Sequence, residues 1–245
     1  MKRGLLPVMV MMLLLAAGLA GAEGEKPWKG SGEIGFLQTT GNSETESLKV
    51  KSGFSYEQGH MLGELKLGAI YSSEETEVDG VKEDKTSAEK YSAAAKGGYK
   101  FTDVDYVFAI ADYVDDRFSG YDYRTNYGVG YGRKIINTET VKLVAEIGPG
   151  YRYDKQDDGT LENEAVARGY LMCSYNFSET AALQQELTIL AGSDNTNTKS
   201  VTALKAQIVG ALSMKASYTL DHNSQVPEDK NKTDRETALT LVYDF

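Results

Sequence analysis

Apolar and polar residues alternate with a period of two along most of the chain after residue 22. In the segment 61–71, every odd-numbered position is apolar or small, and Glu64 and Lys66 occupy the opposite face. The segments 141–153 and 214–221 repeat this pattern. Such alternation predicts strands with one apolar and one wet face, whereas no apolar stripe of helical spacing continues for three or four turns.

Turn-forming residues divide the chain into about twelve such segments of roughly ten residues, close to the ~9–11 residues with which a tilted strand crosses a bilayer. Short connections alternate with longer polar ones at residues 72–85, 154–163, 192–199 and 222–234. This arrangement predicts an all-β, antiparallel, up-and-down transmembrane β-barrel of about 12 strands, with short periplasmic turns and longer extracellular loops, in the bacterial outer membrane. The predicted strands begin near Trp28, Ser47, Met61, Thr86, Tyr106, Arg124, Val141, Glu164, Ala181, Thr198, Met214 and Asp234.

Aromatic side chains gather at the ends of the predicted strands. Trp28, Tyr106 and Tyr175 are among those expected at the short-turn ends, and Tyr113 and Tyr153 are among those near the long-loop ends. A barrel in lipid carries a girdle of aromatic residues at each interface, so this distribution supports the membrane assignment independently of the alternation.

A soluble β-sandwich or lipocalin-like barrel is the main alternative, because it alternates in the same way with its apolar face turned inward. The apolar face of this chain is diluted by small residues such as Ala93, Ala95 and Gly97, where a soluble core would hold bulky side chains. The opposite face carries charges of both signs deep within many strands. Both features favour the membrane barrel.

The first 22 residues have the features of a secretory signal peptide. Lys2 and Arg3 precede an apolar stretch, and Ala20-Gly21-Ala22 forms a small-x-small cleavage site. The predicted domains are therefore a cleaved signal peptide at 1–22 and a barrel domain at 23–245. Removing two positive charges from a net charge of −10 leaves −12, which disfavours nucleic acid as a partner. The single cysteine, Cys173, excludes an internal disulfide framework.

The chain ends on an alternating run, TALTLVYDF. Leu239, Leu241, Tyr243 and Phe245 are expected to face lipid. A last strand that ends on an aromatic residue resembles the recognition signal read by the outer-membrane barrel-assembly machinery, which is therefore an expected partner.

Two segments carry a more specific pattern. The first runs W-x-G-S…G-F…T-G-N at Trp28, Gly30, Ser31, Gly35, Phe36, Thr40, Gly41 and Asn42. The second continues through Asp116, Arg117, Phe118, Gly120, Arg124, Gly128, Gly130 and Tyr131. The pattern resembles the salt-induced outer membrane proteins, a domain-of-unknown-function family of Gram-negative bacteria, over essentially the whole mature chain. The resemblance implies a location and a fold but no activity or catalytic residues, since salt induction describes expression.

The sequence offers no catalytic constellation, and we do not expect an enzyme. His60 lies in a predicted periplasmic turn and His222 at the outer end of the eleventh strand, a membrane thickness apart. His222-Asn223-Ser224 has the His-x-Ser spacing of outer-membrane phospholipases, but no residue that would orient the base is evident. The glycines of 128–132 have no following helix that would make a phosphate loop; they are expected to leave space in the lumen or to allow curvature. No cofactor or defined metal site is predicted.

The interior face carries charges of both signs. Mixed luminal charge can line a water-filled passage for small polar or anionic solutes, and the lysines and arginines outnumber the acids. It can equally close the bore as a salt-bridge network, which gives a structural or envelope-stress barrel whose acidic outer loops contact lipopolysaccharide and divalent ions. The sequence leaves both functions open, and it predicts a monomer in outer-membrane lipid. The residues assigned to the lumen are Glu33, Lys49, Lys51, Glu64, Lys66, Lys96, Lys142, Glu146, Arg152, Arg168, Glu186, Lys205, Lys215 and Asp221.

Overall fold

The computed structural model describes residues 27–40, 45–78, 81–116, 120–226 and 230–245. The predicted signal peptide, residues 1–22, lies outside the described residues. Within the described part of the chain, no helix is long and apolar enough to cross a membrane. The strands are β1 (Trp28–Thr40), β2 (Thr45–Gln58), β3 (Met61–Val78), β4 (Val81–Lys100), β5 (Asp105–Asp116), β6 (Tyr121–Asn137), β7 (Val141–Gln156), β8 (Leu161–Asn176), β9 (Ala181–Gly192), β10 (Thr196–Val209), β11 (Leu212–Asn223) and β12 (Thr233–Asp244).

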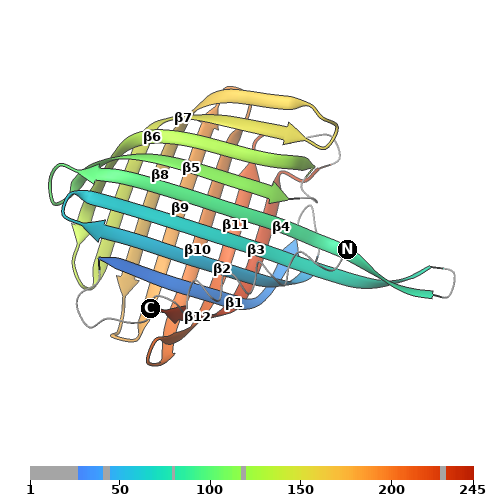
Figure 1. Cartoon of the computed structure of the whole chain (residues 1–245), viewed down its shortest axis with the longest axis horizontal. Helices are drawn as coiled ribbons and strands as arrows, with labels where there is room; N and C mark the ends of the chain where they lie inside the picture. Colours follow the sequence, from blue (N-terminus) through green and yellow to red (C-terminus); the bar gives the residue numbers. More distant parts are fainter. Residues whose placement is uncertain (1–26, 41–44, 79–80, 117–119, 227–229) are drawn as a thin grey trace.

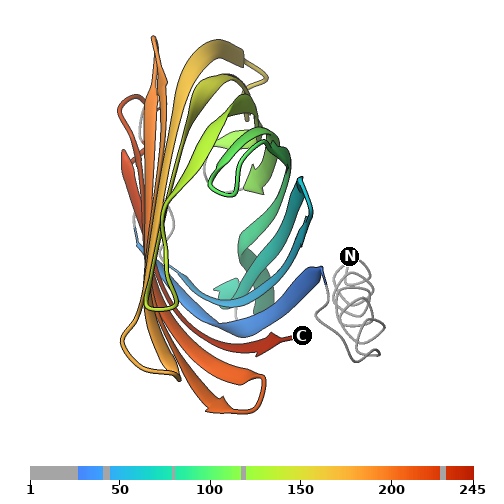
Figure 2. The same ribbon diagram turned by 90° about the vertical axis from the view of Figure 1, so that its left-hand side faces the viewer.

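The twelve strands form one closed antiparallel barrel in which each strand pairs with its neighbours in sequence and β12 closes onto β1. Figure 1 shows β1 to β5 crossing in front of β9 to β11 at a steep angle, as the strand tilt of a closed barrel requires. In Figure 2, the wall containing β9 to β11 is nearly straight and the wall containing β1 to β5 is curved. The predicted all-β, 12-stranded antiparallel barrel is confirmed.

The alternation places large apolar side chains on the outside of the barrel. Ile34, Phe36, Ile147, Leu204 and Leu239 are all strongly exposed, as residues in contact with lipid would be. Residues of the opposite parity point into the lumen, because successive side chains of a strand alternate between its two faces. The hydrophobic pattern is therefore that of a membrane barrel, with its apolar face turned outward.

A cluster of polar side chains on β9 and β10 interrupts the outer face. Gln185 on β9 and Thr202 on β10 have the outward parity and pair directly in register. The Thr202 hydroxyl donates to Gln185 Oε1 over 2.5 Å, and Gln185 Nε2 donates to Ser200 Oγ over 2.9 Å. These side chains satisfy one another, which lowers the penalty of placing them against lipid.

The connections differ from the sequence prediction at the outer end. Residues 72–78 and 81–85, predicted as a loop, are strand, so that β3 and β4 continue as a paired hairpin beyond the barrel wall (Figure 1). Residues 154–156 and 161–163 likewise belong to β7 and β8. The prediction was wrong for these segments because it took polar composition as the sign of a loop, whereas the backbone hydrogen bonds that pair two strands do not require an apolar face.

Two turns at the opposite end are as short as an antiparallel hairpin allows. Gly59 and Gly210 have φ values of 55° and 54° and begin the connections from β2 to β3 and from β10 to β11. Glycine adopts this left-handed conformation without steric penalty, which fits the tight hairpin turns typical of the periplasmic end of such barrels.

Glycines on β6 make room for aromatic rings on β5. A Cβ added to Gly132 would overlap the ring of Tyr106, and one added to Gly130 would lie 2.8 Å from Cζ of Phe108. Both rings point inward and are buried, at 4% and 5% exposure. The prediction that these glycines leave space on the luminal face is confirmed. The placement of Tyr106 in the lipid-facing girdle was wrong.

Aromatic side chains surround the seam between β1 and β12. The ring of Phe245 packs edge-on against Trp28 and Phe54 and stacks on Tyr243, with centroid distances of 6.0–6.3 Å. Phe245 N donates to the carbonyl of Gly30 over 2.9 Å, and Gly30 N donates back to Phe245 O over 2.7 Å. Strand pairing at the seam therefore continues to the last residue.

Candidate functional site in the lumen

Every residue assigned to the lumen from the sequence lies on the inward face, opposite the exposed apolar side chains. On β1 and β2, for example, Glu33 pairs in register with Lys51, whereas the adjacent pair Ile34 and Val50 has the outward parity. The inward residues are Glu33, Lys49, Lys51, Glu64, Lys66, Lys96, Lys142, Glu146, Arg152, Arg168, Glu186, Lys205, Lys215 and Asp221.

A buried carboxylate organises the wall formed by β4 to β8. Glu146 on β7 has a fully buried side chain and accepts hydrogen bonds from Lys96 Nζ and Arg168 Nη1 over 2.9 Å each. The hydroxyl of Tyr106 donates to Glu146 Oε1 over 2.8 Å. Lys96 also lies 2.8 Å from Glu64, which extends the network to β3. Four charged groups therefore compensate one another in a place that is largely closed to water.

A second carboxylate, near the outer end of the lumen, pairs with lysines on two other strands. Glu236 on β12 lies 3.2 Å from Lys49 on β2 and 3.8 Å from Lys90 on β4. Lys90 in turn lies 3.1 Å from Asp116 on β5. Since β1, β2 and β3 stand between β12 and β4 in the wall, the contact between Glu236 and Lys90 crosses the interior.

A third cluster of charged side chains lies at the outer end of β6 to β8. Arg152 pairs with Glu164, and its Nη2 donates to the carbonyl oxygen of Asn195 over 2.9 Å. Asp154 lies 3.6 Å from Arg152 Nε and 3.7 Å from Arg124 Nε. These contacts tie the β9–β10 connection to the barrel wall.

The periplasmic end has a similar bridge. Glu57 at the end of β2 accepts from Lys100 on β4 over 2.5 Å and from Lys134 on β6 over 2.9 Å. Nearer the seam, Lys215 on β11 pairs with Glu33 on β1. At both ends of the bore, therefore, a carboxylate joins lysines from strands that are not neighbours.

Several inward-facing lysines lack such close compensation. Lys51 is exposed and, among the described residues, has no carboxylate within ion-pair distance. The Lys66 side chain is 59% exposed and lies 3.9 Å from Glu64. Lys199 on β10 is 44% exposed and lies 3.8 Å from Asp221. An exposed inward-facing side chain requires space beside it, so the lumen next to these lysines is open to solvent.

Several important luminal residues were not assigned from the sequence. They are Glu57, Lys90, Tyr106, Asp116, Arg124, Asp154 and Glu236. The alternation along β5 could have identified Tyr106 as luminal, because Tyr106 lies on the same inward face as Asp112 and Asp116. Parity could not show that Glu236 meets Lys90, since that contact depends on how the barrel wall curves.

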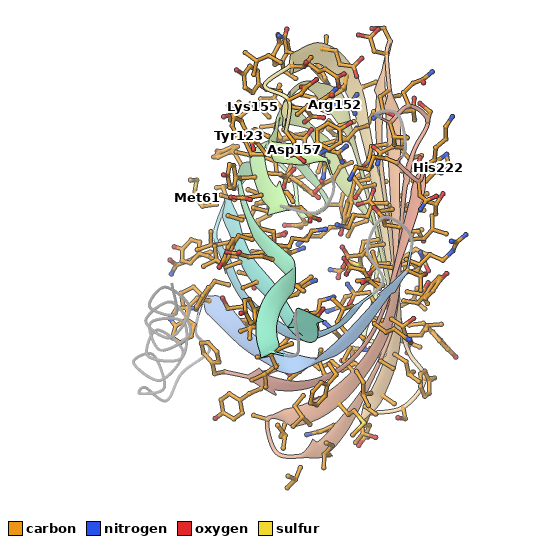
Figure 3. The ribbon with its side chains drawn as sticks, turned by 90° about the vertical axis from the view of Figure 1, so that its right-hand side faces the viewer. Met61, Tyr123, Arg152, Lys155, Asp157 and His222 are labelled. Atoms are coloured by element: carbon orange, nitrogen blue, oxygen red, sulfur yellow. The ribbon has the colours of Figure 1, made fainter. Side chains whose placement is uncertain are left out.

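The histidines do not form a catalytic pair. His60 Nδ1 lies 2.8 Å from the carbonyl oxygen of Lys100 in the turn region, whereas His222 Nδ1 lies 2.8 Å from the Thr233 hydroxyl. Figure 3 places His222 on the opposite wall from Met61, which marks the His60 turn. Among the described residues, no group of three or more His, Cys, Asp or Glu side chains is arranged to hold a metal ion.

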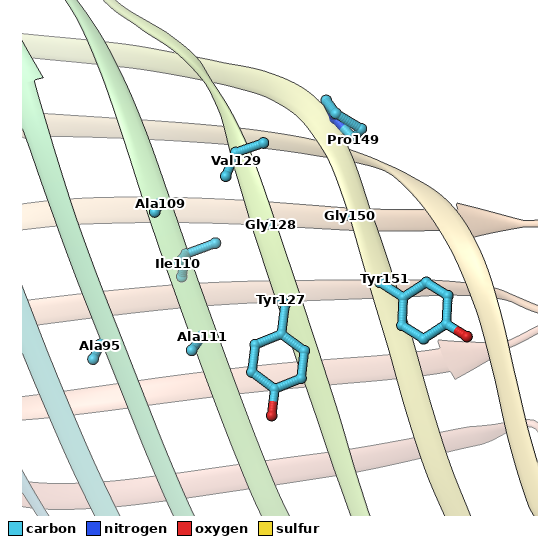
Figure 4. Close-up of a pocket in the computed structure, with 10 residues that line it drawn as sticks. All are labelled: Ala95, Ala109, Ile110, Ala111, Tyr127, Gly128, Val129, Pro149, Gly150 and Tyr151. Carbon is cyan, nitrogen blue, oxygen red and sulfur yellow. The ribbon is translucent and has the colours of Figure 1, made fainter.

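A shallow groove lies on the outer surface over β4 to β7. Its volume is about 590 Å³, and its outward-facing lining includes Ala109, Tyr127, Val129, Pro149 and Tyr151 (Figure 4). Small residues on β4 and β5 lower the surface there, and the two tyrosine rings border it. The groove faces lipid, and its lining carries no charged side chain.

The sequence matches a known family across the whole barrel. The family model described as a protein of unknown function, DUF481, covers residues 32–245. The chain belongs to the DUF481 family. A curated relative, the uncharacterized protein YdiY of Escherichia coli (strain K12), is 30% identical over 223 residues, which cover 91% of this chain and 85% of the relative.

Solved structures of other proteins share this barrel fold. The NanC porin covers 86% of this chain and 98% of its own length, with a TM-score of 0.57 and 9% identity. The translocator domain of the autotransporter NalP from Neisseria meningitidis covers 97% of this chain and 94% of its own, with a TM-score of 0.52 and 13% identity. Together with the apolar outer face, these likenesses identify the chain as an outer-membrane β-barrel protein.

Proposed function

We propose that this DUF481 protein is a narrow, monomeric outer-membrane channel for small polar or anionic solutes. The observation that carries the proposal is the solvent-exposed, poorly compensated state of inward-facing Lys51 and Lys66. Lysines that line a water-filled passage attract anions and repel cations. Lys199, which is 44% exposed on the opposite wall, extends the positive lining across the bore.

The buried ion pairs support the same function in a different way. Glu146, Lys96 and Arg168 lie against one wall and, together with Glu64, carry formal charges that cancel. The cluster therefore holds the barrel in shape and contributes little net charge to the passage. The lysines on β2 and β3 therefore determine the sign of the charge that lines the passage. A fold shared with a protein named as a porin is consistent with conduction.

Planar-bilayer recording of the purified, folded protein tests the proposal. We expect small, steady conductance steps and, under a salt gradient, a reversal potential displaced toward the equilibrium potential of the anion. Silence over a range of salt concentrations and voltages, from protein that migrates differently on a gel before and after boiling, would exclude the channel.

A closed structural barrel is the second candidate, because Glu236 and Glu57 join lysines of non-neighbouring strands at the two ends of the bore. In this function the outer segments contact lipopolysaccharide and divalent ions. Asp158 in the β7–β8 connection accepts a hydrogen bond from the backbone N–H of Thr160 over 2.8 Å, which holds the pKa of its carboxyl below the usual range. It is therefore ionised wherever lipopolysaccharide-bound Mg²⁺ or Ca²⁺ would be met.

Two further expectations belong with either function. The barrel-assembly machinery recognises the last strand through Leu239, Leu241, Tyr243 and Phe245, and expression responds to salt, as the sequence resemblance implies. A reporter fused to the promoter and followed across a series of salt concentrations would test the second expectation directly.

A further inference from the structure

The outer mouth contains an ion-pair bridge between strands that are not neighbours in the barrel wall. Glu236 on β12 pairs with Lys49 on β2, and only β1 lies between these two strands in the wall. It also pairs with Lys90 on β4, and this contact crosses the interior. Lys90 has its own partner on the adjacent strand, because Asp116 lies 3.1 Å away. If Glu236 were removed, Lys90 would remain held against its wall by Asp116 and the bridge across the interior would be lost.

The bridge also divides the luminal lysines into two groups. Lys49 is compensated by Glu236 and only 4% of its side chain is exposed. Lys51, two residues further from the outer end on the same face of β2, is exposed and has no carboxylate of the described residues within ion-pair distance. On β2, therefore, the lysine beside Glu236 is compensated and the exposed lysine lies two residues further into the bore.

We propose that Glu236 is the specificity-determining residue of the outer mouth, where its bridge to Lys90 admits small single anions, such as inorganic anions and short monocarboxylates, and excludes bulky or polyanionic solutes. The substrate class rests on the proposed channel function, whereas the bridge itself does not. A solute with several linked negative charges needs cationic groups along its whole length, and at the outer mouth Glu236 already occupies Lys49 and Lys90.

Chemical labelling tests the bridge without relying on conduction. In a Cys173→Ser background, Ala94→Cys places a single thiol on the inward face of β4, where residue 94 pairs with Lys66 and Asp112 at mid-lumen. Intact cells are treated with either a small neutral methanethiosulfonate or a maleimide carrying a polyethylene glycol chain. We expect the small reagent to label the thiol in all variants. The bulky one should label it about tenfold faster after Glu236→Ala, equivalent to about 1.4 kcal/mol of barrier.

Glu33→Ala is the matched control. Glu33 is also an inward-facing glutamate paired with a lysine, but its partner Lys215 is on β11, on the same side of the bore. The bulky reagent should not gain access in this variant. Equal access of the bulky reagent to the parent, Glu33→Ala and Glu236→Ala proteins would overturn the proposal, as would a Glu236→Ala protein labelled no faster than its parent.

Bilayer recordings separate this inference from the proposed function. In a conducting protein, Glu236→Ala should raise the permeability of gluconate relative to chloride, and Glu33→Ala should leave this ratio unchanged. If the parent protein is silent but Glu236→Ala opens the lumen to the bulky reagent, the channel function fails and the bridge stands as a barrier. If the parent protein conducts and Glu236→Ala changes neither the gluconate ratio nor the labelling, the role of Glu236 is refuted and the channel function stands.

Discussion

The ring of Tyr106 on β5 lies over Gly132 on β6, and the hydroxyl of the same tyrosine donates to Glu146 on β7 over 2.8 Å. One side chain thus links the packing of the wall to the ionic network of the lumen. The relationship requires that residue 132 has no side chain, because a Cβ there would occupy the position of the ring.

Gly132→Ala should therefore lower stability by displacing Tyr106. Overpacking of a filled site costs about 1–3 kcal/mol, and loss of the hydrogen bond to Glu146 adds to this. Gly32→Ala is the control, because nothing lies within 4 Å of a Cβ at that position. The temperature at which the folded band disappears on a gel of unboiled protein should fall for Gly132→Ala and stay close to the parent value for Gly32→Ala.

Glu146→Gln tests the buried network. The substitution keeps the shape of the side chain but leaves Lys96 and Arg168 without their shared counter-charge. Removing one partner of a buried ion pair costs about 3–5 kcal/mol, whereas exposed pairs contribute at most about 1 kcal/mol. Urea unfolding in detergent should show a large loss for Glu146→Gln and a small one for Glu64→Gln, whose side chain is 37% exposed. Equal losses would contradict the central position of Glu146.

The fold could be predicted from the sequence because a barrel strand encodes its two faces by parity alone. Each step of one residue reverses the direction of the side chain, so Lys49 and Lys51 had to share a face opposite Val50. The outer hairpin of β3 and β4 was missed, since the segment 72–85 is polar at nearly every position and leaves no period in its hydrophobicity.

The contacts of the luminal residues could not be predicted in the same way. Parity shows that Glu236 and Lys90 both point inward, but the curvature of the wall decides that these two side chains, on strands four positions apart, come within 3.8 Å of each other. The unpaired state of Lys51 depends on the same geometry. Whether a luminal lysine is free or neutralised is therefore a property of the closed barrel and cannot be read from one strand.

This distinction predicts unequal effects of charge reversal on ion selectivity. Lys205 lies 2.6 Å from Asp244 and is already compensated, whereas Lys51 has no such partner among the described residues. In a conducting protein, Lys51→Glu should reduce the preference for anions more than Lys205→Glu does. Reversal potentials under a salt gradient measure this preference. A larger effect of Lys205→Glu would show that the exposed lysines do not determine selectivity.

Phe245→Ala is expected to impair barrel assembly while leaving export intact. The substitution removes the ring that packs among Trp28, Phe54 and Tyr243 at the seam between the first and last strands. Phe177→Ala provides the comparison, because Phe177 is an exposed aromatic residue of the same girdle, away from the seam. Outer-membrane levels at native expression should fall for Phe245→Ala only. Equal levels of both variants would argue against recognition of the terminal residue.

The β3–β4 hairpin reaches farther from the membrane than any other paired segment of the described chain. β4 has 20 residues. At about 3.3 Å per residue and a tilt of about 40°, a strand of this length rises about 50 Å, roughly twice the ~25 Å apolar band of an outer-membrane barrel. On an intact cell, a phage tail fibre or an antibody would therefore meet this ribbon before it could touch the barrel. Natural variation driven by such encounters should concentrate there and spare the bore.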